Sequence, residues 1–253
     1  MDKRIFTTIT ALIGFFLCTT VFAQEEAGVE INGIVWATCN VDDFGVFAAN
    51  PEDRGMLYRW NDRVAWPPFT IDITNWSTVV YAGFTWHEYN NPCPVGWRVP
   101  DSNEFGKLND SDNVSMKWIT VKGINGESFT DKMTGNSIFL PAAGYRLGNN
   151  GALDRVNLYG YYWCSSVFNL TYAWYLSFHS GQTAMFEIGN HNGYAQSVRC
   201  VVDDTAIAIT TILAEESKII GYYSITGQKL PQAPEKGIYI VMYDNGKTEK
   251  VAK

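Results

Sequence analysis

Side chains with catalytic or metal-binding chemistry are few in this chain and lie far apart. The three histidines, His87, His179 and His191, show no spacing typical of metal ligands. The run Asn109 to Asn113 is rich in oxygen ligands, but it lacks the glycine and the distal glutamate of an EF-hand loop. Phosphate-binding, dinucleotide-binding, zinc-protease, nucleophile-elbow and C-x-x-C motifs are also missing. The sequence therefore predicts no catalytic residue, no metal and no cofactor.

Aromatic side chains offer more chemistry than the titratable ones. They make up 15% of the chain, and Trp60, Trp66, Trp76 and Trp86 fall within one irregular segment. Aromatic ring faces bury flat apolar surfaces well, and the face of a sugar ring is one such surface. These tryptophans either form a binding platform, with Trp60 and Trp66 as candidates, or belong to the core.

The elements that must position these side chains are mainly strands. Asn32-Gly33 suits a type I′ turn and predicts a hairpin over Val29 to Trp36. Residues Ala173 to His179 alternate, with Trp174, Leu176 and Phe178 on one face. A further turn is expected at Asn125-Gly126.

One helix is predicted directly after Pro100. Asp101 is its expected N-cap, and Glu104 completes a capping box. Strands outnumber helices and do not alternate regularly with them. We therefore predict the α+β class, with a mainly antiparallel mixed sheet and one or two short helices.

The N-terminus has the pattern of an export signal. Lys3 and Arg4 precede an apolar run, and Val21-Phe22-Ala23 predicts cleavage after Ala23. The run is too short to span a membrane. A buried N-terminal helix, or lipidation at Cys18, are the alternatives. We expect a secreted or outer-surface protein that does not span the membrane.

The charge of the chain excludes one class of partner. The formal charge is −7, and residues 1–23 contribute +1 (Asp2, Lys3, Arg4), so the mature chain carries −8. Nucleic-acid binding needs basic clusters, so a nucleic-acid partner is not expected.

The last fifty residues differ in character from the rest. Asp203-Asp204-Thr205 predicts a boundary between a main domain, 24–203, and a β-rich tail, 204–253. Strands are expected at Ile219 to Ile225 and at Gly237 to Tyr243.

Four strings in fixed order resemble a known family. They are NPCPVGWRVP (91–100), SIFLPAAGYR (137–146), YGYYWCSS (159–166) and QSVRCV (196–201). Together they resemble the Fibrobacter succinogenes major paralogous domain, an extracellular bacterial family similar in fold to C-type lectins and formylglycine-generating enzymes. The resemblance implies a C-type-lectin-like fold, and it brings no known activity.

The tail carries a second resemblance. The string GYYSITGQKLPQAPEKGIYIVMYDNGKTEKVAK (221–253) resembles the C-terminal sorting domains of type IX secretion substrates. This implies the type IX secretion machinery as a partner. The alternative is a small accessory module with no sorting role.

The cysteines of an exported chain can form disulfides. Loss of Cys18 leaves Cys39, Cys93, Cys164 and Cys200, which permit two bridges in three connectivities. We favour Cys39 with Cys93, which joins two loop motifs of the resemblance, and Cys164 with Cys200, which joins two strand-like segments. The sequence departs from the resemblance at Cys164, where relatives usually carry serine. Buried free thiols are the alternative.

The resemblance also indicates where a ligand would bind. In C-type-lectin-like folds, ligands often bind on the long loop before the third main strand, here Arg146 to Asn157. Its polar candidates are Asn149, Asn150, Asp154 and Arg155, and the loop holding His191 is expected beside it.

We therefore expect an exported, non-catalytic recognition protein that binds a glycan or an extracellular protein. One alternative is a formylglycine-generating-type or redox enzyme, although Cys200 lies 36 positions from Cys164 (200 − 164). A structural surface or adhesin component is the other.

Overall fold

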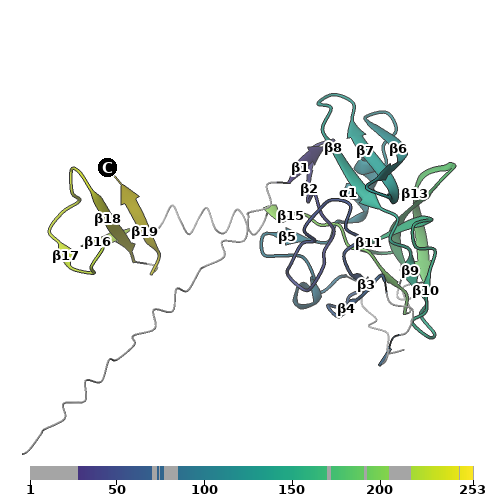
Figure 1. The fold of residues 1–253 in the computed structure, drawn as a ribbon, viewed down its shortest axis with the longest axis horizontal. Coiled ribbons are helices and arrows are strands. Elements are labelled where there is room, and N and C mark those ends of the chain that lie inside the picture. Colours follow the sequence, from purple (N-terminus) through teal and green to yellow (C-terminus); the bar gives the residue numbers. More distant parts are fainter. Residues whose placement is uncertain are drawn as a thin grey trace, which may run out of the picture.

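Strands dominate the structure, a computed structural model. It describes residues 28–69, 73, 75–76, 85–169, 172–190, 193–204, 218–244 and 246–252, with only the backbone at 183 and 185–190. Strand accounts for 45% of the described residues, in several antiparallel sheets that include a curled half-barrel. Among the described strands, Figure 1 labels a short α-helix. The predicted signal peptide lies outside the described residues.

The α+β class predicted from the sequence is therefore wrong, because the structure is mainly β. The expected antiparallel pairing is present, but α1 (Ser102–Leu108) has only seven residues. A helix of two turns cannot form a layer over a sheet, which the α+β class requires.

The first sheet joins both ends of the body, by which we mean residues 28–204. Strands β1 (Val29–Ile31) and β2 (Ile34–Trp36) form the predicted hairpin. Asn32 and Gly33 both have positive φ, 48° and 75°, as a type I′ turn requires. Strand β2 pairs with β15 (Val201–Val202), which also pairs with β5 (Trp97–Arg98).

This pairing determines the disulfide. Strand β15 brings Cys200 beside the loop before β5, and Cys93 in that loop bonds to Cys200 with the Cα atoms 6.1 Å apart. The expected pairs Cys39–Cys93 and Cys164–Cys200 are not formed, and Cys39 and Cys164 are buried thiols. The reason is topological, because Cys164 and Cys200 belong to different hydrophobic clusters of the core.

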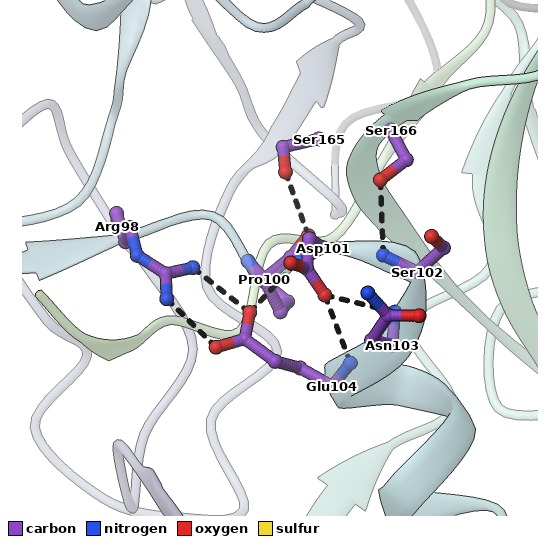
Figure 2. Close-up of polar contacts among 8 residues, drawn as sticks. All are labelled: Arg98, Pro100, Asp101, Ser102, Asn103, Glu104, Ser165 and Ser166. Carbon is purple, nitrogen blue, oxygen red and sulfur yellow. Dashed lines mark hydrogen bonds and ion pairs between the residues drawn. The ribbon is translucent and has the colours of Figure 1, made fainter.

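Helix α1 begins where the sequence predicts. Asp101 accepts from the backbone N–H of Asn103 and Glu104, and Glu104 Oε2 accepts from Asp101 N–H at 2.7 Å, which completes the capping box. Figure 2 shows this arrangement, with the Arg98 guanidinium donating to both Glu104 oxygens. Ser165 donates from N–H and Oγ–H to the Pro100 carbonyl, which ties the helix to the strand that carries Ser165.

A three-stranded sheet follows the helix. It consists of β6 (Val114–Val121), β7 (Ile124–Asp131) and β8 (Ser137–Pro141). The turn between β6 and β7 falls at Lys122-Gly123, where φ is 46° and 84°. The turn expected at Asn125-Gly126 is therefore wrong. Gly126 lies inside β7, so close to β8 that a Cβ there would be 2.3 Å from the Leu140 carbonyl oxygen.

The next two sheets position the candidate site. The three-stranded one has the order β11 (Tyr159–Val167), β12 (Tyr172–His179) and β13 (Gln182–Asn190). The five-stranded one has the order β10 (Leu153–Asp154), β9 (Tyr145–Arg146), β14 (Ala195–Gln196), β3 (Leu57–Arg59) and β4 (Ala65–Trp66). A 3₁₀ helix, η1 (Glu88–Asn90), lies between β4 and β5 in the chain.

Two buried arginines fix the loops between these sheets. Arg199 is fully buried and donates to the carbonyl oxygens of Ala37 and Phe139 and to Asn40 Oδ1. Arg146 is fully buried as well and donates to the carbonyl oxygens of Pro67 and Gly151. Carbonyl acceptors thus satisfy these guanidinium groups.

The tail forms its own four-stranded antiparallel sheet. Its order is β17 (Lys229–Leu230), β16 (Ile219–Ser224), β18 (Ile238–Tyr243) and β19 (Thr248–Ala252). The two strands expected from the sequence are confirmed. Across the described part of the chain, no helix has the length and apolar character to cross a membrane.

Candidate functional site

The two candidate tryptophans lie in different environments. Trp60 is 2% exposed, and its Nε1–H donates to the Cys164 carbonyl at 2.9 Å. No ring face of Trp60 is therefore open to a ligand. Trp66 is half-buried and packs against Trp76, with ring centroids 4.7 Å apart.

The polar candidates lie at two places in the β9–β10 hairpin. Asn149 and Asn150 are exposed at its tip, whereas Asp154 ends β10 and Arg155 follows it. Gly193, which follows the loop holding His191, lies against Gly148 of the hairpin, as a Cβ built on Gly193 would be 3.0 Å from the Gly148 Cα. His191 itself lies outside the described residues.

Asp154 and Arg155 border an aromatic surface that the sequence did not suggest. Strand register creates its first half, because Tyr159 pairs with His179, Tyr161 with Ser177 and Trp163 with Tyr175. Directly paired residues share a face of the sheet. The half-buried rings of Tyr159 and Tyr161 are almost parallel, 11° apart, with centroids 5.9 Å apart.

The five-stranded sheet supplies the second half. Tyr145 on β9 meets Tyr161 edge to face at 5.0 Å and Tyr194 at 5.6 Å. Tyr161 also contacts Tyr175 at 6.0 Å. We call this set the tyrosine surface: Tyr145, Tyr159, Tyr161, Tyr175 and Tyr194, all of them half-buried.

Charged groups form the edge of the tyrosine surface. The Tyr145 hydroxyl donates to Asp154 Oδ2 at 3.0 Å, and Arg155 donates to the Tyr161 hydroxyl at 3.0 Å. The Arg155 guanidinium also lies 4.6 Å from the Tyr159 ring centroid, in cation–π geometry. Burial, followed by the hydrogen bond to Asp154, raises the pKa of Tyr145 to about 12. Tyr145 is therefore neutral at physiological pH. The five tyrosines present hydroxyl groups and ring faces.

The backbone at this edge is held in an unusual conformation. Arg155 and Asn157 have φ of 57° and 63°, the left-handed region that non-glycine residues rarely adopt. Asn157 is fixed by its Oδ1, which accepts from Asn125 N–H at 2.7 Å, and by its own N–H, which donates to the Ala142 carbonyl. Strain of this kind persists where surrounding contacts enforce it, often at ligand sites.

Other reactive groups in the described residues give weaker evidence for a functional site. Burial raises the pKa of the Cys164 thiol to about 12, which disfavours the reactive thiolate. A hollow of about 330 Å³ is lined partly by Asp42, Glu52 and Asp53. Glu52, however, pairs with Lys122, and Asp53 Oδ2 accepts from Asn50 N–H. Within the described ranges, no group of three or more His, Cys, Asp or Glu side chains could hold a metal ion.

Comparison with known proteins leaves the family open. No family model matches the chain, and neither a curated protein nor a solved structure matches it. The resemblances drawn from the sequence strings therefore stay predictions.

The tyrosine surface was missed although part of its signal is visible. In YGYYW, Tyr159 and Tyr161 are two positions apart, so they lie on the same face of a strand. Tyr145 and Tyr194 join that face only through pairing between distant strands, which the sequence does not reveal.

Proposed function

We propose that this protein is an exported, non-catalytic recognition protein that binds a carbohydrate on the tyrosine surface. The observation that carries the proposal is the contact of five half-buried tyrosine rings on one face, bordered by Asp154 and Arg155. Sugars present apolar C–H faces to rings and hydroxyl groups to polar side chains, and this surface offers partners for both.

Rigidity supports the same proposal. Four of the rings lie on paired strands, and Tyr194 directly precedes β14. The edge residues lie on a backbone fixed by hydrogen bonds. A site that is already ordered loses less conformational entropy when a ligand binds. The export signal and the sorting-like tail remain predictions that would deliver this surface to the outside of the cell.

A binding screen with matched variants tests the proposal. The full chain is titrated calorimetrically with cellotetraose, mannotetraose and N-acetylchitotetraose. We expect at least one tetrasaccharide to bind, and Tyr161→Ala to weaken its binding about fivefold because an aromatic contact worth about 1 kcal/mol is lost.

The control is Tyr89→Ala, which removes an exposed tyrosine on η1 whose hydroxyl and ring contact Arg63. Its affinity should equal that of the wild type. Failure of all three sugars to bind, or equal losses in both variants, would overturn the proposal.

A further inference from the structure

The inner strand β18 of the tail sheet has apolar side chains on both of its faces. On one face, Tyr239 and Val241 are 3% and 4% exposed and therefore buried. Ile238, Ile240 and Met242 alternate with them, so they lie on the other face. An antiparallel sheet with one solvated face normally carries polar residues on that face. The second face of the tail sheet is thus apolar where polar residues are expected.

This second face is open to the solvent. Ile238 is 50% exposed, and Ile240 and Met242 are half-buried. On the neighbouring strand β16, a Cβ built on Gly221 would be 3.0 Å from the Tyr223 ring and 3.5 Å from Lys229 Cε. The ring of Tyr223 and the stem of Lys229 therefore lie together on this side of the sheet.

Lysines border the open face on both sides. Tyr223 pairs with Lys229 of β17 and with Ile240 of β18, and Ile240 pairs with Lys250 of β19. Directly paired residues share a face, so one row across all four strands begins and ends with an exposed lysine. We call this side of the sheet the tail face: Gly221, Tyr223, Lys229, Ile238, Ile240, Met242 and Lys250.

The acidic residues of the described tail lie elsewhere. Glu249 pairs with Val241 and so lies on the buried face. Asp244 follows β18 and accepts from a backbone N–H at 2.9 Å, and Glu235 lies in the connection between β17 and β18. The tail face is therefore cationic, although the whole chain has a formal charge of −7.

We infer that the tail face docks on a membrane surface that carries anionic lipid headgroups. The apolar side chains enter the boundary between headgroups and acyl chains, and the lysines at the two borders attract lipid phosphates. A second copy fits less well, because a two-fold contact through the same face would bring lysines against lysines. This inference is independent of sugar binding on the tyrosine surface.

The test measures vesicle binding by co-sedimentation. It uses the chain from Gln24 onward, because the predicted export signal is basic and apolar and would bind vesicles itself. We expect binding to vesicles of equal parts phosphatidylglycerol and phosphatidylcholine, and much weaker binding to phosphatidylcholine alone. Binding should weaken between about 0.05 M and about 0.5 M NaCl, because salt screens the lysines.

The decisive variant combines Lys229→Gln with Lys250→Gln. Each lysine near an anionic surface contributes about fivefold to the partition coefficient, so the pair should weaken binding about thirtyfold. The matched control combines Lys107→Gln with Lys117→Gln, which removes the same charge from exposed positions of the body and should keep wild-type binding.

Three results would overturn the inference. They are equal binding to both kinds of vesicle, equal losses in the two double variants, and no binding by the wild type. Sedimentation without vesicles that rises with protein concentration would identify a second copy as the partner of the tail face and would overturn it as well.

Discussion

At the scale of single residues, Glu127 is the side chain whose surroundings conflict most with its charge. It is 2% exposed on β7, and its Oε2 has no hydrogen-bond partner in the described residues. Burial raises the pKa of Glu127 from 4.5 to about 7. On the same face of β7, Phe129 is fully buried in the core. Burial is the cause of this shift, because an ionised carboxylate here loses its hydration.

This environment predicts that stability falls as pH rises. The pKa is higher in the folded state than in the unfolded state, so the folded chain binds the proton more tightly. The stabilisation is complete below about pH 4.5 and is lost as pH rises through about 7, with a total of at most about 3 kcal/mol. Glu127→Gln should therefore lose less unfolding free energy than the wild type between pH 5 and pH 8, as measured by urea denaturation.

The control for this change is Glu30→Gln, at an exposed position of β1. It should keep the wild-type pH dependence. An unchanged slope in Glu127→Gln would show that Glu127 ionises in the folded protein as easily as in the unfolded chain.

At the scale of elements, the β9–β10 hairpin determines where Asp154 and Arg155 lie. Gly144, which precedes β9, has φ of 70°, and a Cβ there would be 2.3 Å from the Asp154 carbonyl oxygen and 2.7 Å from Val156 N. Only glycine permits this approach. The edge of the tyrosine surface therefore depends on a residue with no side chain.

Gly144→Ala and Gly135→Ala distinguish the cost of a positive φ from the cost of a steric clash at the added Cβ. Gly135 has a similar φ of 77° but open space around it, so its substitution measures the conformational cost alone, about 1 to 2 kcal/mol. Gly144→Ala should cost at least about 2 kcal/mol more, because the backbone of residues 154–156 must shift. Thermal and urea unfolding measure both values. Equal costs for the two variants would mean that the hairpin adjusts freely.

Several elements were predictable because their signals are local. The turn at Asn32-Gly33 and the capping box of Asp101 and Glu104 each depend on residues within one short segment. The turn after β6 was misplaced because Lys122-Gly123 and Asn125-Gly126 compete within five residues. Packing of Gly126 against Leu140 of β8 decides between them, and that contact is not visible in the local sequence.

At the scale of the whole molecule, long-range pairing decides what the sequence leaves open. The Cys93–Cys200 bond closes 107 residues and follows from the pairing of β15 with β5. The tyrosine surface joins Tyr145, Tyr161 and Tyr194 from three strand regions of two sheets. Asp154 and Arg155 were identified from sequence as polar residues of a loop. The tyrosines beside them were not predicted. The predicted ring platform was made of tryptophans, of which Trp60 is part of the core.

The central claim is that a sugar binds across the tyrosine rings, and ring-selective NMR tests it most directly. The full chain is labelled with ring-¹³C tyrosine, its signals are assigned with Tyr→Phe variants, and each of the three tetrasaccharides is added in turn. We expect the signals of Tyr145, Tyr159 and Tyr161 to shift with the binding sugar, while those of buried Tyr58 and of Tyr222 in the tail stay in place. Shifts confined to tyrosines outside the tyrosine surface, or no shift with any of the sugars, would contradict this account.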